Sequence, residues 1–329
     1  MIVTFTPNPS IDATLELDSL EVGGVNRALR ACREAGGKGI NVARACAQAG
    51  QPTLAIAPCG PTDPFTLLCR TADVPLKTVP IDGTVRTNTT LSERGGRTTK
   101  INETGPLLGS ADVARITDTV ISTMAEGGAD AVVMAGSLPP GAPLDWYATL
   151  ARQIRKACPG AVVAIDTSDK PLVALSAHLA DAAPDVMKPN AFELAQLTDS
   201  GTTGRELEQQ AARGDYAEIS AHAETLRSAG VKEVVVTLGA AGAVLVTGSG
   251  AWAATAPPAA AQSTVGAGDS ALAGYIMARV AGEAPAECLR RSVAYGSAAA
   301  AKPATGIPSP AEIDLAHTDV FPLSTSEKD

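Results

Sequence analysis

Short, continuous apolar runs rich in β-branched residues recur along this chain, and stretches with helical spacing separate them. The strand candidates are 2–6, 53–58, 131–136, 161–167, 185–190, 233–239 and 243–248, and several of them are continuous and β-branched. The helical stretches are 36–50, 111–127, 144–160 and 216–230. Runs that are apolar throughout are typical of strands covered on both faces. The alternation therefore predicts an α/β fold: a mostly parallel sheet with helices on both faces.

Two segments break this alternation. Residues 84–104 alternate Thr and Asn with charged residues around a central Gly-Gly, which predicts an exposed hairpin, and residues 12–30 have a similar period of two. We expect both segments to form a small β-sheet inserted in a single domain spanning 1–329. Such a sheet is either a pair of surface ribbons or a lid over an active site. If the chain forms a homodimer, we expect the lid to make the contact.

Charge and cysteine usage narrow the class of partner. The chain has 26 Lys and Arg against 35 Asp and Glu, a net charge of −9, and no basic block. This argues against a nucleic-acid or acidic membrane surface. No apolar run is long enough for a membrane span, and the first residues lack the pattern of a signal peptide. Six cysteines without a CxxC pair argue against a zinc site or disulfide framework and favour a reducing cytoplasm.

The segment 262–275, QSTVGAGDSALAGY, places an aspartate directly after a Gly-x-Gly turn and at the start of a helical run. A helix N-terminus presents unpaired N–H groups and a partial positive charge, so it suits an anion. Asp269 is either a helix cap or a base beside an anion hole formed by the backbone of Gly266, Ala267 and Gly268. Spacing alone leaves both interpretations open.

Two familiar phosphate motifs do not explain this segment. A dinucleotide fingerprint belongs after the first strand of a βαβ unit, whereas here too little of the chain follows for a nucleotide-binding half. The sequence GGKG at 36–39 has no Ser or Thr after its lysine, so it is not a P-loop. The dehydrogenase and P-loop interpretations are therefore rejected.

The segment STVGAGDSALAGY instead resembles the C-terminal signature of the phosphofructokinase B branch of the ribokinase superfamily. GGKGINVARACAQAG at 36–50 is similar to the N-terminal signature of that branch. Three further blocks resemble the family in the same order: AGSLPPG (135–141), KPNAFE (188–193) and VTLGAAGAVLV (236–246). The resemblance covers nearly the whole chain and implies a Rossmann-like (ribokinase-like) main domain with a β lid. It also implies transfer of the ATP γ-phosphate to a sugar hydroxyl, with Asp269 as base and 266–268 as anion hole.

Within the branch, TPNPSID (6–12), GGKG and TKINETGP (99–106) look most like 1-phosphofructokinases and tagatose-6-phosphate kinases. The resemblance thus implies conversion of fructose 1-phosphate to fructose 1,6-bisphosphate. Tagatose 6-phosphate, or an unphosphorylated sugar or nucleoside, is the alternative acceptor, and a non-catalytic phosphosugar sensor is the alternative from another class. The expected substrate-binding residues are Asp12, Arg27, Gly37, Lys38, Asn41, Arg86, Lys100 and Ser137. Lys38, Arg27 and Arg86 are expected to bind the acceptor phosphate.

On the nucleotide side, Asn190 and Glu193 resemble the Asn-x-x-Glu element of the family, which organises Mg²⁺, usually through water. The expected ATP-binding residues are Lys188, Thr237, Gly239, Gly242, Thr264 and Ala298. Ala298 lies in a small-residue segment, 295–306, that resembles the part of the family packed on adenine. The expected partners are therefore a small phosphosugar, ATP and Mg²⁺, with no nucleic acid and no membrane.

Overall fold

The computed structural model describes residues 1–199, 201–256, 263, 265–302 and 306–323. Within these ranges a large sheet forms the main body. Its strands are β1 (Ile2–Phe5), β4 (Thr53–Pro58), β5 (Leu76–Val79), β8 (Ala131–Ala135), β9 (Val162–Asp166), β10 (Val186–Met187), β11 (Glu233–Thr237), β12 (Ala243–Thr247), β13 (Gly250–Thr255) and β14 (Asp319–Leu323). They lie in the order β14-β13-β12-β11-β10-β9-β8-β1-β4-β5. The pairs from β11 to β5 are parallel, and β12, β13 and β14 extend the other edge antiparallel.

Helices follow most of the parallel strands, as crossover connections require. They are α1 (Lys38–Gln48), α2 (Pro64–Thr71), α3 (Ser110–Glu126), α4 (Trp146–Ala157), α5 (Asp169–Ser176), α6 (Leu179–Ala182), α7 (Ala191–Thr198), α8 (Gly204–Ala211), α9 (Ala217–Ser228), α10 (Ala267–Val280) and α11 (Pro285–Ala300). In the described residues, none of these helices has the length and apolar character to cross a membrane.

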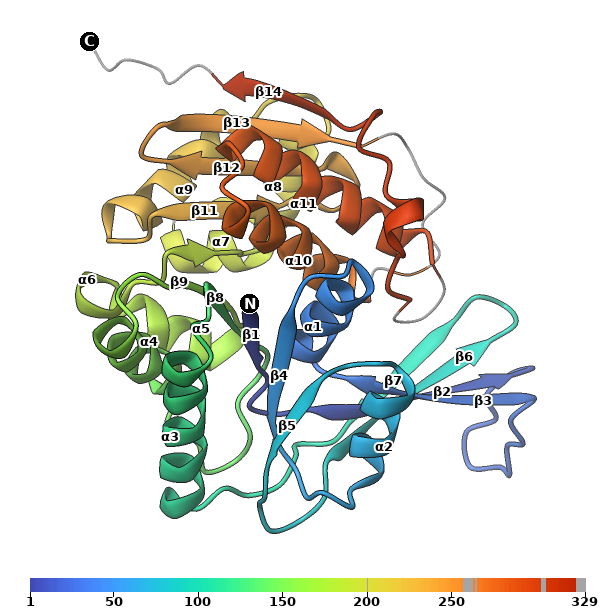
Figure 1. Ribbon diagram of the computed structural model, residues 1–329. Helices are drawn as coiled ribbons and strands as arrows, with labels where there is room; N and C mark the ends of the chain where they lie inside the picture. The colour runs from blue at the N-terminus through green and yellow to red at the C-terminus, as the bar shows by residue number, and fades with distance from the viewer. Residues whose placement is uncertain (200, 257–262, 264, 303–305, 324–329) are drawn as a thin grey trace.

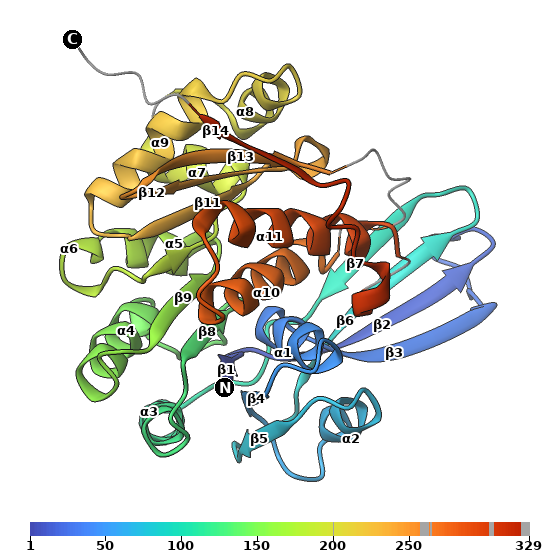
Figure 2. The ribbon, with the colours of Figure 1, turned by 45° about the horizontal axis from the view of Figure 1, so that its top comes forward.

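Each face of the large sheet has its own layer of helices. On β8, Val132 and Met134 belong to a buried cluster with α3, α4, α7 and α9. The alternate residues Ala131, Val133 and Ala135 belong to a second cluster with α1, α10 and α11. Figures 1 and 2 show α1, α10 and α11 together on one side of the sheet. Because successive residues serve opposite cores, the strand is apolar throughout, and the predicted fold class is confirmed.

A second, four-stranded sheet projects from the main body (Figure 1). Its strands are β3 (Arg30–Gly36), β2 (Ser10–Leu17), β6 (Arg86–Glu93) and β7 (Thr98–Asn102), in that order. β6 and β7 form an antiparallel hairpin within 84–104, and β2 lies parallel to β6. The other expected segment, 12–30, contains most of β2 but ends where β3 begins. β3 has the sequence RACREAG, without a β-branched residue, so its strand conformation depends on pairing with β2.

Three strands of the large sheet were not predicted from the sequence: β5, β13 and β14. β13 reads GAWAAT, and alanine is depleted in strands, so its conformation follows from its ladders with β12 and β14. The expected strand at 185–190 is shorter than predicted, because only Val186 and Met187 pair on both sides. The chain then leaves the sheet at Lys188 and touches it again through a bridge between Asn190 and Thr237.

The turn before β12 gives a test of backbone strain. Gly242 has a φ of 91°, and a Cβ there would overlap the carbonyl oxygen of Ala254 on β13. Gly242→Ala should therefore lower the free energy of unfolding by about 1–3 kcal/mol or more. Gly248→Ala is the matched control, because a Cβ at that turn meets no atom within 4 Å. Urea unfolding midpoints measure the difference, and equal midpoints for the two variants would contradict the strain argument.

Candidate active site

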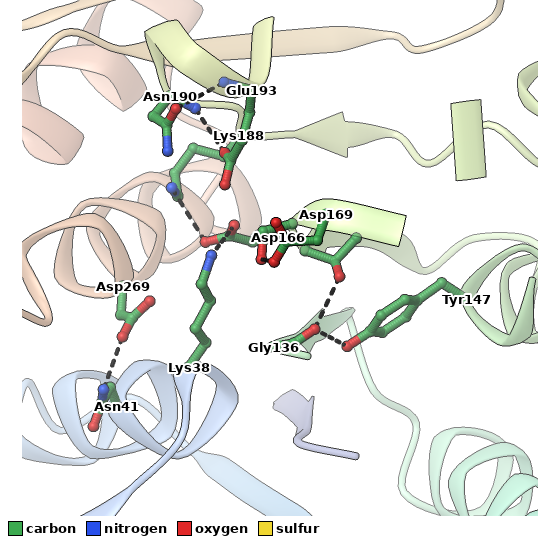
Figure 3. A network of polar contacts seen from close by, with 12 residues as sticks. Lys38, Asn41, Gly136, Tyr147, Asp166, Asp169, Lys188, Asn190, Glu193 and Asp269 are labelled. Carbon is green, nitrogen blue, oxygen red and sulfur yellow. Dashed lines mark hydrogen bonds and ion pairs between the residues drawn. The ribbon is translucent and has the colours of Figure 1, made fainter. Parts of the chain in front are cut away.

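Polar side chains gather where four parallel strands of the large sheet end. β10, β9, β8 and β1 lie side by side, so their carboxyl ends share one edge. Asp166 is the last residue of β9, Lys188 follows β10, and Ser137 follows β8. The first turns of α1 and α10 bring further side chains to this edge, as Figure 3 shows. In open α/β sheets this edge is where ligands bind.

A buried carboxylate lies between two ammonium groups at the centre of this edge. Lys38 Nζ lies 2.8 Å from Asp166 Oδ1, and Lys188 Nζ lies 3.1 Å from Asp166 Oδ2. Burial alone would raise the pKa of Asp166, but the two lysines hold it below its usual value. Lys38 and Lys188 were predicted as site residues, whereas Asp166 was missed. The available signal was an acidic residue in the otherwise apolar run 161–167.

Asp269 lies next to this cluster, on the first turn of α10. Asn41 Nδ2 donates a hydrogen bond to Asp269 Oδ2 over 2.8 Å. Burial raises the pKa of Asp269 to about 6, although the Lys38 ammonium and the Asn41 hydrogen bond act in the opposite direction. The N-cap of α10 is Gly266, and no described backbone N–H of the helix donates to Asp269. A carboxyl group with this pKa and no capping role is suited to accept a proton at neutral pH.

The turn that leads into α10 lies against a lysine. Gly266 has a φ of 79°, in the left-handed region that favours glycine. A Cβ on Gly268 would lie 3.3 Å from Lys188 Nζ, so the helix N-terminus and this ammonium are neighbours. The predicted anion hole, residues 266–268, therefore has a cation beside it that sequence spacing did not link to it. Thr264, a predicted ATP-binding residue, lies outside the described residues.

Glycines at the start of α1 allow this helix to approach the end of β1. Gly37 has a φ of 112°, and a Cβ there would lie 2.7 Å from Thr6 Cγ2. A Cβ on Gly39 would lie 2.5 Å from Thr6 Oγ1. A larger residue at either position would push the helix away from the sheet. The close approach sets the positions of Lys38 and Asn41.

The small sheet contributes a cation at the other end of the site. The Arg86 guanidinium on β6 donates to Ser137 Oγ and to the backbone carbonyl of Asn8, both over 3.3 Å. It also donates to the carbonyl oxygen of Glu103 over 3.1 Å. Asn8 Nδ2 donates to Ser137 Oγ over 3.4 Å. A cavity of about 540 Å³ opens beside Arg86 and Ser137, so these two predicted residues meet where a ligand has room.

Asp12 lies on β2 at the base of the small sheet. Its Oδ1 accepts hydrogen bonds from Ser10 Oγ over 2.8 Å and from Asn88 Nδ2 over 3.3 Å. Burial raises the pKa of Asp12, which these hydrogen bonds lower in part. Its carboxylate lies over Gly36, where a Cβ would collide with it. Asp12 therefore holds strands of the small sheet together as well as lying near the site.

Two predicted substrate-binding cations lie apart from these contacts. Arg27 is exposed in the connection between β2 and β3, and Lys100 is exposed on β7. Neither side chain forms a hydrogen bond or ion pair with a residue in the described ranges. Their roles remain predictions.

The Asn-x-x-Glu element begins α7 as a reciprocal cap. Asn190 Oδ1 accepts from the backbone N–H of Glu193, and Glu193 Oε2 accepts from that of Asn190, each over 2.9 Å. Burial raises the pKa of Glu193, and Lys38 lowers it in part. In the part of the chain that the structure describes, no group of three His, Cys, Asp or Glu side chains is arranged to hold a metal ion. A metal at this element would therefore take most of its ligands from water and substrate.

The other predicted nucleotide residues follow β11 or lie on α11. Thr237 ends β11, and Gly239 and Gly242, with φ values of 58° and 91°, form the turn beyond it. Ala298 is partly exposed on α11. Their contacts with ATP remain predictions.

The model of the pfkB family carbohydrate kinases matches residues 6–312. The chain belongs to this family. It is therefore a carbohydrate kinase, a phosphotransferase with an alcohol group as acceptor and ATP as phosphoryl donor. The family resemblance predicted from the sequence is confirmed.

Similar proteins carry related names. A 1-phosphofructokinase from Xanthomonas campestris pv. campestris is 37% identical over 297 residues, covering 89% of each chain. A 1-phosphofructokinase from Haloferax volcanii is 35% identical, covering 99% of this chain and 100% of its own. The phosphofructokinase-2 of Escherichia coli in complex with fructose-6-phosphate is 29% identical with a TM-score of 0.79, covering 91% of this chain and 93% of its own. That enzyme has also been solved in a tetrameric inhibited form.

The pKa of Asp269 predicts how the activity of this kinase depends on pH. A base must be unprotonated, so kcat/KM should be full well above pH 6 and fall as the pH drops through about 6. Lys38→Met removes a cation that favours the charged carboxyl, so the acid limb should move to higher pH. Lys156→Met, which changes an exposed lysine on α4, should leave the limb unchanged. An acid limb near 3.9, the usual pKa of aspartate, would contradict this assignment.

Proposed function

We propose that this chain phosphorylates a ketohexose phosphate, converting fructose 1-phosphate and ATP to fructose 1,6-bisphosphate and ADP. The observation that carries the proposal is the buried Asp269, with a raised pKa, at a helix N-terminus beside Lys188. This pairs a base with a positive site for a phosphoryl group. The names of the similar proteins, several of them 1-phosphofructokinases, support the choice of acceptor.

The proposed reaction assigns a separate task to each side of the site. Asp269 accepts the proton of the acceptor hydroxyl as its oxygen attacks the γ-phosphorus of ATP in line. The backbone N–H groups of residues 266–268 and the Lys188 ammonium stabilise the charge of the transferring phosphoryl group. Asn41 orients the Asp269 carboxylate. Lys38 favours the charged form of Asp269 before the hydroxyl arrives.

Magnesium fits this site as an ion held mainly by water and phosphate oxygens. Asn190 and Glu193 use one oxygen each in the cap of α7, which leaves the second Glu193 oxygen free to accept from metal-bound water. Mg²⁺ retains several waters, in agreement with the few carboxylates at this edge. Bound there with ATP, it would neutralise charge on the phosphates.

Arg86 favours a phosphorylated acceptor over an unphosphorylated one. Its guanidinium hydrogen-bonds to neutral oxygens and pairs with no carboxylate in the described ranges, so its charge is available to an anion. Tagatose 6-phosphate and fructose 6-phosphate remain the rival acceptors within the class. A phosphosugar sensor without catalysis is the rival from another class, and the environment of Asp269 disfavours it.

We further propose that the small sheet is a lid and also the contact of a homodimer. Large apolar residues are exposed here: Val22 (90%) and Val25 (79%) in the connection between β2 and β3, and Ile101 (57%) on β7. Such exposure is expected where a second surface covers the side chains. The six free cysteines support a reducing compartment, the cytoplasm.

An ADP-release screen over ketose phosphates tests the proposed reaction. Fructose 1-phosphate should give the highest kcat/KM, about 10² or more above free fructose, because a charged phosphate contact contributes roughly 1.5–3 kcal/mol. Asp269→Asn should lower kcat by about 10²–10⁴ and change phosphosugar affinity little. A higher kcat/KM with tagatose 6-phosphate or fructose 6-phosphate would mean that this sugar phosphate, and not fructose 1-phosphate, is the acceptor. Normal turnover by Asp269→Asn would refute the base, and no turnover of any sugar by the wild type would favour the sensor.

The role of the Asn-x-x-Glu element in Mg²⁺ binding can be tested separately. Glu193→Gln should raise the Mg²⁺ concentration that gives half-maximal rate, because a charged acceptor for metal-bound water is lost. Glutamine can still cap α7, so the unfolding midpoint should hardly change. Glu206→Gln is the matched control, since Glu206 makes the equivalent cap of α8 with Thr203. If both variants keep the wild-type Mg²⁺ titration, Glu193 has only a structural role.

A further inference from the structure

The cavity beside Arg86 extends past Ser137 to the start of α5. Asn8, Arg86 and Ser137 line one part of it, and Ser168, Asp169 and Lys170 line another. Arg86 comes from β6 of the small sheet, whereas the other residues follow β1, β8 and β9, which are adjacent in the large sheet, and Ser168 comes two residues after Asp166. The cavity is therefore a continuation of the active-site edge.

Two cations that line this cavity form no ion pair with a carboxylate of the described residues, although the charges of Asp12 and Glu103 act on Arg86. Arg86 donates its hydrogen bonds to two carbonyl oxygens and one hydroxyl. Lys170 is exposed, and its side chain forms no hydrogen bond or ion pair with any residue in the described part of the chain. By contrast, Lys38 and Lys188 share the carboxylate of Asp166. In a chain with a net charge of −9, two unpaired cations on one cavity favour an anionic ligand.

One carboxylate, that of Asp169, lines the described cavity and offsets part of this charge. Ser168 Oγ donates to it over 3.2 Å. Asp169 has a φ of 56°, a conformation that Asp and Asn adopt more readily than most residues. An Asp-to-Asn change can therefore remove the charge and keep the backbone.

We propose that Lys170 determines specificity for the phosphorylated acceptor: with Arg86 it binds the acceptor phosphate, and Asp169 moderates that affinity. Arg86 approaches the phosphate from β6 and Lys170 from the first turn of α5. The partial positive charge of that helix terminus acts in the same direction. This assignment rests on the proposed function, because it takes the ligand to be the phosphosugar acceptor.

Lys170→Met should raise KM for fructose 1-phosphate about five- to tenfold, the effect of losing one charged contact at a partly exposed site. kcat and KM for ATP should stay at wild-type values, because Lys170 does not touch the reacting atoms. kcat/KM for free fructose should also be unchanged. Lys170→Arg should restore most of the affinity. Lys156→Met, an exposed and unpaired lysine on α4 in the described structure, is the matched control and should leave every constant unchanged.

Asp169→Asn should act in the opposite direction. Removal of the negative charge should lower KM for fructose 1-phosphate about two- to fivefold, with free fructose again unaffected. Opposite shifts in these two neighbouring variants cannot arise from a general loss of structure. A wild-type KM for Lys170→Met, or a weaker affinity for the phosphosugar in Asp169→Asn, would overturn the proposal.

Calorimetric binding of fructose 1-phosphate in the absence of ATP separates this proposal from the proposed function. If the wild type binds the phosphosugar, and Lys170→Met binds it about five- to tenfold less tightly, the assignment of Lys170 holds even when turnover is absent. If the wild type turns the phosphosugar over and Lys170→Met binds it equally well, the proposed function stands and the assignment of Lys170 is wrong. If the wild type neither binds nor phosphorylates it, both are wrong.

Discussion

The carboxylate of Asp166, held between two lysines, is the interaction on which the rest of the site depends. A buried charge is tolerated only when its partners are close, and here they lie at 2.8 and 3.1 Å. Lys38 comes from α1 and Lys188 from the end of β10, so one anion fixes two distant segments at the same edge. Loss of Asp166 would leave two neighbouring ammonium groups to repel each other. The cation beside Asp269 is thus in position before any substrate binds, which is electrostatic preorganisation.

The sheet edge that carries the site could be predicted from the sequence, because the apolar runs identify the strands that form the two buried clusters of the large sheet. Alternate residues of a strand such as β8 pack against helices on opposite faces of the sheet, so every residue of the strand is apolar. Asp269, Lys38 and Asn41 stood out because glycines precede them, and those glycines are where α1 and α10 approach the sheet and Lys188. A close backbone approach requires glycine at a given position, so it is visible in the sequence. Asp269, Lys38 and Asn41 could therefore be predicted without a structure.

Asp166 was missed because its one signal in the sequence, an acidic residue in the run 161–167, does not show which side chains lie beside it. Its partner Lys38 is 128 residues away, and only the parallel sheet brings them together. The same limit applies to the small sheet. β3 is a strand because β2 pairs with it, and the small-sheet cations Arg86 and Lys100 look alike in sequence. Strand register gives Arg86 a place beside Ser137 and leaves Lys100 exposed.

The position of β1 inside the sheet, between β4 and β8, has a consequence for synthesis of the chain. Ile2 pairs with Thr53 on one side but with Ala131 on the other. At translation rates of about 5–20 residues per second, β1 waits on the order of ten seconds for its second neighbour. During that time an apolar strand has an open hydrogen-bonding edge next to the ribosome, which is an aggregation hazard. A chain of this topology should therefore depend on slow, ordered emergence or on a chaperone more than a helical protein of the same size does.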